Sequence, residues 1–357
     1  NSRTLRVIQS MEEEKYMRRC IQLAQNGLCN TAPNPMVGAV IVCDGKIIGE
    51  GYHIRCGEAH AEVNAIRSVK EPSLLKRSTI YVSLEPCAHY GKTPPCADLI
   101  IEKQIPRIVI GCQDPFAKVA GRGIQKLKDA GREVIVGVLE EDCKNLIRRF
   151  VTFHSLHRPY ITLKWAESAD KHIDKCRKDG KPVILSTPLT SMLVHKRRAE
   201  HSAIMVGTHT AELDNPSLTV RNWQGQSPVR IVIDRQQRLS PSLHLFDDSI
   251  RTLVFTGQPH AAFPNTEYIV IDFQQNILPQ IMQHLYAQGL QSLLVEGGSY
   301  LLQSFINAEL WDEIFVEESP LKLFSGVKAP EIGNKIPYVN EQYFGRNFRH
   351  YIATRLG

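Results

Sequence analysis

The feature that most constrains this chain is a set of potential metal ligands between His60 and Cys96. The segment begins His60-Ala61-Glu62, and Cys87 and Cys96 follow further along the chain. One histidine and two cysteines can hold a zinc ion and leave its fourth position open, which is typical of catalytic rather than structural zinc sites. Glu62 lies two residues after the histidine, where a carboxylate can transfer protons beside the metal. The chain must therefore fold so that these four side chains converge.

The order His-x-Glu, Pro-Cys and a second Cys resembles the zinc nucleobase deaminases, in which the glutamate is the general acid and base. That pattern has two residues between its cysteines, whereas eight separate Cys87 from Cys96. An alternative makes both cysteines small core residues and His60 a surface residue. That alternative does not explain the Gly, Pro, His and Lys between the cysteines. We expect either a longer loop that carries the second ligand or a distinct branch of these enzymes.

The longer loop indicates the branch. Pro86-Cys87-Ala88-His89-Tyr90-Gly91-Lys92-Thr93-Pro94-Pro95-Cys96, with Pro33-Asn34-Pro35-Met36-Val37-Gly38 upstream, resembles the bifunctional riboflavin-biosynthesis deaminase/reductase family over nearly the whole chain. The resemblance implies a cytidine-deaminase-like α/β/α sandwich followed by a dihydrofolate-reductase-like α/β domain. It implies zinc-dependent deamination of 2,5-diamino-6-(5-phosphoribosylamino)pyrimidin-4(3H)-one. NADPH-dependent reduction of the ribosyl group would then give 5-amino-6-(5-phosphoribitylamino)uracil.

Four residues of the first half are implied to contact the substrate: Asn34, His53, His89 and Lys92. Asn34 lies between two prolines, and its alternative role is to close an Asx-turn. His53 can equally be a surface histidine with no substrate contact. Lys92 can bind a phosphate or a pyrimidine oxygen, or it can be a solvated lysine of the loop. The metal ligands implied are His60, Cys87 and Cys96, with Glu62 as the catalytic residue.

The second half contains Leu294-Val295-Glu296-Gly297-Gly298-Ser299, which predicts a strand that enters a helix through a Gly-Gly turn. Such a turn presents backbone N–H groups at the positive end of a helix, which suits a pyrophosphate. The turn does not match the longer Rossmann fingerprint, so a different dinucleotide-binding fold is expected. On the resemblance, Glu296 contacts the substrate and the segment from Gly297 through Gly298 to Ser299 binds NADPH.

Two further segments match the family's reductase, Val206-Gly207-Thr208-His209-Thr210 and Leu213-Asp214-Asn215-Pro216-Ser217-Leu218-Thr219-Val220-Arg221. The resemblance implies the remaining contacts. The cofactor would be bound by Ala166, Asp170, Gly207, Thr210 and Asp214, and the substrate by Arg198, Leu218 and Arg221. The two guanidinium groups are suited to the ribose phosphate. Two segments depart from the family: Ser168-Ala169-Asp170-Lys171 replaces Ser-Leu-Asp-Gly, and residues 175–187 lack the usual Ser and Trp.

Apolar periodicity predicts alternating strands and helices, and hence an α/β protein with parallel strands. Asp44-Gly45 predicts a hairpin turn, and His157-Arg158-Pro159 ends a helix, which places the domains at 11–156 and 157–357. Helices are expected over 12–26, 60–69, 97–104, 123–130, 140–154, 188–199, 277–288 and 299–308. Strands are expected over 36–43, 46–53, 78–84, 107–111, 133–138, 160–166, 203–207, 229–234, 251–256, 268–272, 292–296 and 312–317.

Charge and composition bear on which kinds of molecule the chain can bind. The net charge of +6 is modest, and the chain has no long Lys/Arg block, RNA-binding aromatic signature or membrane-length apolar run. We therefore expect no nucleic acid or membrane partner. The resemblance implies a small phosphorylated pyrimidine as substrate, and a homo-oligomer is also expected. The alternatives are a deaminase of nucleobases in nucleic acid with a non-catalytic second domain, and a structural zinc domain. Glu62 argues against the latter.

Cysteine content bears on the compartment. The nine cysteines lack framework spacing, which suits a reducing cytoplasm. The first ten residues lack the apolar core of a secretory signal. Met11 is expected to be the native start, with the residues before it an extension.

Overall fold

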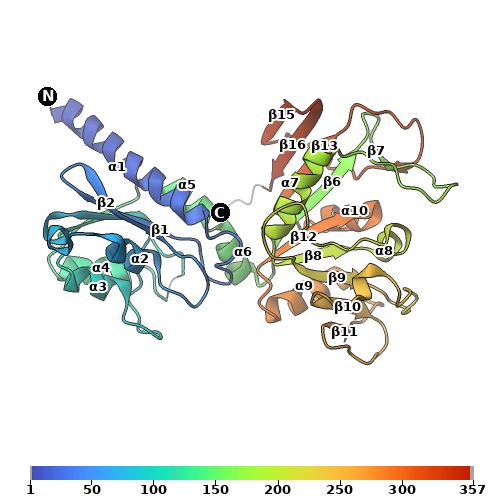
Figure 1. Ribbon diagram of the computed structural model, residues 1–357, viewed down its shortest axis with the longest axis horizontal. Coiled ribbons are helices and arrows are strands. Elements are labelled where there is room, and N and C mark those ends of the chain that lie inside the picture. The colour runs from blue at the N-terminus through green and yellow to red at the C-terminus, as the bar shows by residue number, and fades with distance from the viewer. Residues whose placement is uncertain (1, 117, 354–357) are drawn as a thin grey trace. The chain divides into compact units, whose positions relative to one another are not determined.

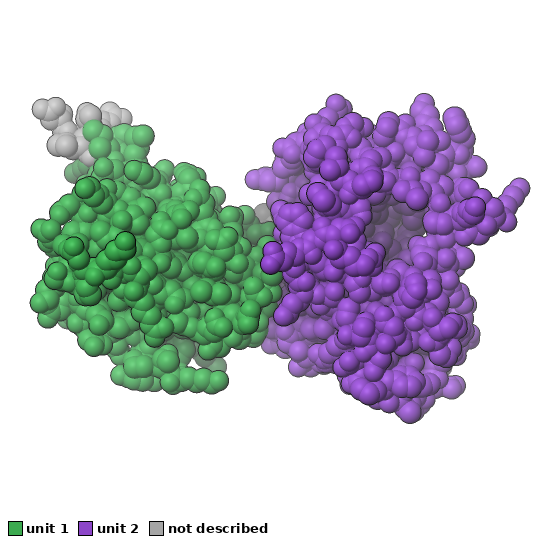
Figure 2. All heavy atoms as spheres, viewed as in Figure 1, with its two compact units in different colours: residues 1–151 green, residues 152–357 purple. Residues whose placement is uncertain are grey.

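The computed structural model describes residues 2–116 and 118–353. It divides into two compact units, residues 1–151 and 152–357, which are coloured separately in Figure 2. The division falls inside helix α6 (Arg148–Leu156), and the predicted domain boundary follows the last residue of that helix. Among the described residues, no helix combines the length and apolar character needed to cross a membrane.

Unit 1 contains a five-stranded sheet in the order β2-β1-β3-β4-β5. Figure 1 labels its first two strands, β1 and β2, and the helices of this unit. Strands β3, β4 and β5 are parallel, as predicted, and β1 and β2 form the predicted antiparallel hairpin. Strand β1 also pairs with β3 in the antiparallel direction. Asp44 and Gly45 join β1 to β2 with positive φ angles of 50° and 72°, which suits a two-residue hairpin turn. The strands are β1 Gly38–Cys43, β2 Lys46–Tyr52, β3 Thr79–Leu84, β4 Arg107–Cys112 and β5 Glu133–Val136.

Helices cover both faces of this sheet because successive strand residues point to opposite sides. Ile80 faces α2 (Ala61–Ser68), α3 (Cys96–Glu102) and α4 (Arg122–Asp129) within one apolar core. Tyr81 faces α1 (Ser2–Gln25) and α5 (Glu140–Leu146) within the other. The predicted α/β/α sandwich is therefore confirmed. A short 3₁₀ helix, Pro72–Arg77, precedes β3.

Two helices of unit 1 differ from the prediction. Helix α1 begins at Ser2 rather than at residue 12. The predicted helix over 140–154 is two helices, α5 and α6, separated at Ile147. Ile147 caps α5 and is buried in the core beside Cys143, so the chain turns where this apolar side chain enters the core.

Unit 2 contains a nine-stranded sheet in the order β11-β10-β9-β8-β12-β6-β13-β16-β15. The strands from β11 to β13 in this order are parallel, and β16 is antiparallel to both β13 and β15. A separate pair joins β7 to β14. The strands are β6 Tyr160–Glu167, β7 His172–Asp174, β8 Ala203–Val206, β9 Val229–Ile233, β10 Thr252–Thr256, β11 Thr266–Val270, β12 Ser292–Gly297, β13 Glu313–Glu318, β14 Val327–Lys328, β15 Val339–Tyr343 and β16 Arg346–Ile352.

Helices α9 (Ile277–Ala287) and α10 (Ser299–Asn307) pack on one face of this sheet and bury its main apolar core. Helix α8 (Thr208–Asp214) packs on the other face through Ala211. Helix α7 (Pro188–Ala199) begins with a capping box formed by Thr187 and Thr190. A 3₁₀ helix, His244–Phe246, follows β9. This is the predicted dihydrofolate-reductase-like domain.

The sequence-based prediction missed α8, β7 and every strand after β13. The β15–β16 hairpin turns at Phe344 and Gly345, whose φ angles are 53° and 70°. Two positive φ angles are what a tight hairpin needs, but phenylalanine seldom adopts one. The turn therefore carried no clear sequence signal.

Candidate active sites

The three predicted zinc ligands converge beyond the carboxyl end of β3. His60 is the N-cap of α2, Cys87 follows β3, and Cys96 is the first residue of α3. His60 Nδ1 lies 3.7 Å from Cys87 Sγ and 3.3 Å from Cys96 Sγ. The three ligand atoms all lie within 4.8 Å of one another.

These separations fit zinc. With Zn–S bonds of about 2.3 Å and Zn–N bonds of about 2.0–2.1 Å, tetrahedral angles place a nitrogen and a sulfur ligand about 3.5 Å apart. The observed distances of 3.3 and 3.7 Å bracket that value. In the described part of the chain, no other group of three His, Cys, Asp or Glu side chains is arranged to hold a metal. Two thiolates and one imidazole leave one position of a tetrahedral ion open.

The long loop between the cysteines returns to its own beginning. The backbone N–H of Cys96 donates to Cys87 Sγ at 3.2 Å, and that of Ala97 donates to the Cys87 carbonyl at 3.1 Å. Residues 88–95 therefore form a flap whose two ends are joined at the metal site. The eight-residue spacing is compatible with two ligands on one ion.

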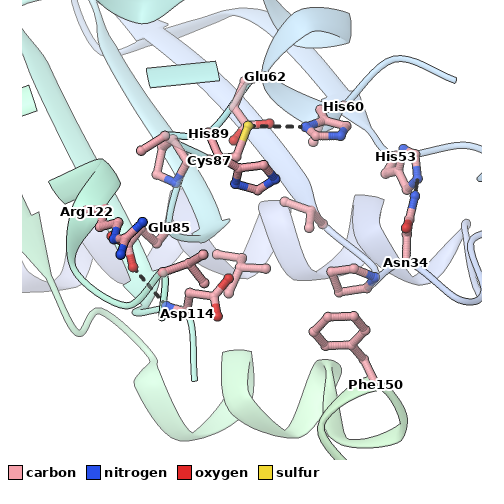
Figure 3. A pocket seen from close by; sticks show the side chains of 17 residues that line it. Asn34, His53, His60, Glu62, Glu85, Cys87, His89, Asp114, Arg122 and Phe150 are labelled. Atoms are coloured by element: carbon pink, nitrogen blue, oxygen red, sulfur yellow. Dashed lines mark hydrogen bonds between the residues drawn. The ribbon is translucent and has the colours of Figure 1, made fainter. Parts of the chain in front are cut away.

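Glu62 lies in the first turn of α2 and is 4% exposed (Figure 3). Burial raises the pKa of its carboxyl group to about 7, and the Cys87 thiolate adds to that rise. The carboxyl group is thus almost completely shielded from solvent and lies beside the ligands His60 and Cys96. A group in this place can exchange protons with a molecule bound in front of it.

A cavity of about 350 Å³ opens in front of this cluster. Its lining contains His60, Glu62 and Cys87 together with three of the four predicted substrate residues, Asn34, His53 and His89 (Figure 3). The fourth, Lys92, lies exposed on the flap and is not part of the lining.

Asn34 and His53 form one hydrogen-bonded unit in this wall. His53 Nδ1 lies 3.1 Å from the Ala59 carbonyl, which can only accept, so Nδ1 carries the proton. His53 Nε2 therefore accepts from Asn34 Nδ2 at 3.2 Å. Burial lowers the pKa of His53, which favours this neutral form. The pair holds the Asn34 amide in a fixed orientation at the cavity wall.

Sequence reasoning missed several residues of the cavity lining, among them Glu85, Asp114, Arg122 and Phe150. The buried Glu85 carboxylate accepts backbone N–H bonds from Asp114 at 2.9 Å and from Gly121 and Ile124 at 3.1 Å. It thereby fixes the segment that carries Asp114 and Arg122. Asp114 follows the carboxyl end of β4, the edge where open α/β sheets bind ligands, and that position was a usable signal. Phe150 lies on α6, far along the chain from the other lining residues, and no sequence signal indicated it.

In unit 2, Arg198 and Glu296 form a largely buried ion pair with two parallel hydrogen bonds. Arg198 Nε and Nη2 donate to the two carboxylate oxygens at 2.9 and 2.7 Å, and Nη1 donates to the Thr219 carbonyl at 3.1 Å. Burial raises the pKa of Glu296, but Arg198 outweighs it and holds the pKa below its usual value. The pair joins two predicted substrate residues to the segment that carries a third, Arg221.

The predicted cofactor turn is assembled from β8 and β12, which are adjacent strands. The backbone N–H of Gly207 donates to the Gly297 carbonyl at 2.8 Å, and Gly297 has a φ of 147°. The peptide bond between Gly297 and Gly298 is cis. A Cβ on Gly298 would lie 2.9 Å from Thr210 Oγ1. The φ of Gly297 lies in the region that favours glycine, and a Cβ on Gly298 would require the Thr210 side chain to shift. The backbone N–H groups at the start of α10 suit the phosphates of NADPH.

Other predicted cofactor residues lie close to this turn or support it. Ser299 Oγ donates to the Lys328 carbonyl at 2.7 Å. Ala166 lies near the carboxyl end of β6, which is next to β12 in the sheet. Asp214 ends α8 and pairs with Arg177 at 2.6 Å.

The Asp170 side chain forms hydrogen bonds with the backbone of a distant segment of unit 2. Its carboxylate accepts from the N–H groups of Leu323 at 3.0 Å and Phe324 at 2.7 Å. Lys171, where the family has glycine, adopts a φ of 65°. The loop thus keeps a glycine-like conformation, and the Lys171 ammonium pairs with Glu318 at 2.6 Å.

The predicted substrate residues Leu218 and Arg221 lie on one segment after α8. Leu218 is buried against the sheet in an apolar cluster. Arg221 is exposed, and its Nη1 donates to Thr219 Oγ1 at 2.7 Å. The guanidinium therefore faces solvent, where a phosphate can reach it.

Family models match both halves of the chain. The cytidine and deoxycytidylate deaminase zinc-binding region matches residues 10–112, and the RibD C-terminal domain matches residues 159–324. The chain is 36% identical over 329 residues to riboflavin biosynthesis protein RibD of Bacillus amyloliquefaciens, covering 90% of this chain and 87% of that protein. It is 36% identical over 337 residues to RibD of Escherichia coli K12, covering 89% and 90%.

Solved structures agree over both units. A diaminohydroxyphosphoribosylaminopyrimidine deaminase/5-amino-6-(5-phosphoribosylamino)uracil reductase from Thermotoga maritima superposes with a TM-score of 0.86 at 37% identity, covering 96% of this chain and 99% of that one. RibD of Acinetobacter baumannii superposes with a TM-score of 0.85 at 31% identity, covering 97% and 100%. With both family domains present in order and matched over nearly their full length, the chain belongs to the RibD family of bifunctional riboflavin-biosynthesis enzymes.

Proposed function

We propose that this chain deaminates 2,5-diamino-6-(5-phosphoribosylamino)pyrimidin-4(3H)-one in unit 1 and reduces the product's ribosyl group in unit 2. The observation that carries the first assignment is the convergence of His60, Cys87 and Cys96 beside the buried Glu62 in one cavity. The Gly297-Gly298 turn supports the second. The cofactors are Zn²⁺ and NADPH.

In the deaminase site, His60, Cys87 and Cys96 would hold Zn²⁺. When bound, the ion lowers the pKa of water in its open position from about 15.7 towards about 7. Glu62 takes a proton from the attacking water and delivers it to the ring nitrogen. As the bond from carbon to the 2-amino group breaks, Glu62 passes a proton to the departing ammonia. The net change is one water consumed and one ammonia released.

Substrate recognition in this cavity is assigned to Asn34, His53, His89 and Lys92. The Asn34 amide, oriented by His53, offers hydrogen bonds to the pyrimidine edge. His89 lies in the cavity lining beside the metal ligands. Lys92, exposed on the flap, is assigned to the substrate phosphate outside the cavity.

In the reductase site, the cofactor is assigned to Ala166, Asp170, Gly207, Thr210, Asp214, Gly297, Gly298 and Ser299. NADPH supplies the hydride that opens the ribosyl group to a ribityl chain. Glu296 and Leu218 border the substrate, and Arg198 and Arg221 bind its phosphate. Three of the five Arg198 N–H groups are used within the protein, which leaves two for a phosphate oxygen.

The test follows both reactions on one preparation. Ammonia release and the loss of NADPH absorbance at 340 nm are recorded with the phosphorylated diaminopyrimidine. Both signals are expected, in equal molar amounts at completion. Ammonia without NADPH oxidation would contradict the reductase assignment, and a deaminase of nucleic acid would then regain support. The family match over residues 159–324 disfavours that alternative.

Three further assignments are proposals about organisation. We place the domains at 11–156 and 157–357, and limited proteolysis that cuts elsewhere would contradict this. A homo-oligomer is supported by several large apolar side chains of unit 2 that are exposed to solvent, Phe324, Ile336, Tyr338 and Phe344. Light scattering at the mass of a single chain would contradict it. A cytoplasmic location is supported by nine cysteines without a disulfide, and fractionation tests it.

A further inference from the structure

The segment 214–221, which carries Asp214, Leu218 and Arg221, has an unusual backbone. Asn215 has a φ of 42° and Leu218 a φ of 56°, both in the left-handed region that side chains other than glycine seldom adopt. Such a path persists only where surrounding contacts determine it. The contacts that hold this segment therefore decide where the Arg221 guanidinium is presented.

Helix α7 holds the segment at two points. His195 is 4% exposed, and its Nδ1 accepts the backbone N–H of Arg221 at 2.9 Å and that of Asn222 at 3.4 Å. One turn later, Arg198 donates to the Thr219 carbonyl at 3.1 Å. A ring nitrogen that accepts an N–H bond carries no proton, so His195 is neutral with its proton on Nε2.

We propose that His195 is a positioning residue of the reductase: its neutral ring fixes the backbone of Arg221 for phosphate binding, and protonation of the ring releases it. This inference rests on the proposed role of Arg221 as a phosphate ligand. A protonated imidazole has only donors, so the Arg221 N–H would face a second donor in place of an acceptor. The segment would then lose one of its two anchors on α7.

The charges around His195 come from four elements. Arg198 lies on α7, Arg221 on the held segment and Lys164 on β6, and Glu296 on β12 is the single anion among these groups. Burial lowers the pKa of His195, the three cations lower it further, and Glu296 opposes them. The ring is therefore neutral above its ordinary pKa of about 6.5. Positioning is present at neutral pH and is lost as pH falls through the lowered value.

Two substitutions separate positioning from mere packing. In His195→Asn, the amide oxygen takes the place of Nδ1 and accepts the same N–H without titrating. In His195→Leu, the acceptor is gone. At pH 7.5 the leucine variant should raise KM for the phosphorylated reductase substrate about tenfold, with kcat changed far less. The asparagine variant should hold KM within about threefold of the parent.

The pH profile provides the readout that packing alone does not move. Between pH 7.5 and 5.5, KM should rise more steeply in the parent than in His195→Asn. The substrate phosphate also titrates, with a second pKa of about 6, but it affects both proteins alike. The ratio of the two KM values therefore isolates the histidine. Parallel profiles for the two proteins would overturn the proposal.

Arg221→Ala, measured alongside, separates this inference from the proposed function. If Arg221→Ala leaves KM unchanged, the phosphate role fails and the inference fails with it. If Arg221→Ala raises KM but His195→Leu does not, the inference alone is wrong. The thermal midpoint of NADPH oxidation with the deaminated substrate reports the folding of unit 2 in each variant. If the leucine variant does not fold, the pH comparison of the parent with His195→Asn decides the matter.

Discussion

Glu85→Gln should weaken the deaminase while sparing the reductase. The buried Glu85 carboxylate accepts three backbone N–H bonds, from Asp114, Gly121 and Ile124. A glutamine amide has one oxygen, so its NH₂ group must face at least one of these donors. The segment that carries Asp114 and Arg122 into the deaminase cavity then loses an anchor.

The magnitude follows from these bonds. Keeping the bonds to Asp114 and Gly121 sacrifices the one to Ile124, and a hydrogen bond to a charged group is worth about 1.5–3 kcal/mol. The two that remain become neutral, and charge-assisted bonds are roughly twice as strong as neutral ones. The total loss is about 3–6 kcal/mol. At about 2–4 °C per kcal/mol for a domain of this size, unit 1 should unfold at least about 6 °C lower.

The assay is thermal inactivation of each activity, measured separately on one preparation. Ammonia release should fail at a lower temperature in Glu85→Gln, whereas NADPH oxidation with the deaminated substrate should keep its midpoint. Glu102→Gln is the matched control, because Glu102 is exposed on α3 and makes the same change of charge. A deaminase midpoint that shifts no more in Glu85→Gln than in the control would refute the reasoning.

Three other changes should have separable effects. Glu62→Gln should slow ammonia release by about 10²–10⁴-fold with zinc retained, since an amide cannot transfer protons; near-normal turnover would exclude the role. Cys96→Ser should lose zinc, measured by metal analysis, whereas Cys143→Ser should keep it; full zinc in the first would refute the ligand set. Gly298→Ala should weaken NADPH binding in a fluorescence titration, because the new Cβ would lie 2.9 Å from Thr210 Oγ1 and displace the turn. An unchanged affinity would contradict the assignment of this turn to the cofactor.

The metal site could be predicted because its chemistry depends on residue type. Few arrangements other than a zinc site use His60, Cys87 and Cys96 with a glutamate two residues from the histidine. The eight residues between the two cysteines did not prevent them from converging, because the Cys96 N–H bond to Cys87 joins the two ends of the flap. Two roles were left open for Lys92, a substrate contact and a solvated position on the loop, because the direction of a flap side chain depends on tertiary packing; the side chain is exposed.

What could not be predicted depends on contacts between distant segments. Arg122 enters the cavity because Glu85, far away in sequence, binds the backbone of its segment. Phe344 and Lys171 adopt positive φ angles that their residue types disfavour. The β15–β16 hairpin was therefore missed, and no sequence signal indicated that the Lys171 loop keeps a glycine-like conformation. The mutual pairing of Arg198 and Glu296 was also hidden, since each had been assigned to the substrate separately.

The central claim is that one chain carries two active sites that act in order, of which the first alone needs zinc. The most direct measurement is NADPH oxidation at 340 nm by the intact protein after its zinc has been removed by a chelator. The stripped protein should oxidise NADPH with the deaminated pyrimidine but not with the diaminopyrimidine, and added zinc should restore the second reaction. NADPH oxidation with the diaminopyrimidine in the absence of zinc, or loss of both reactions on stripping, would contradict the account.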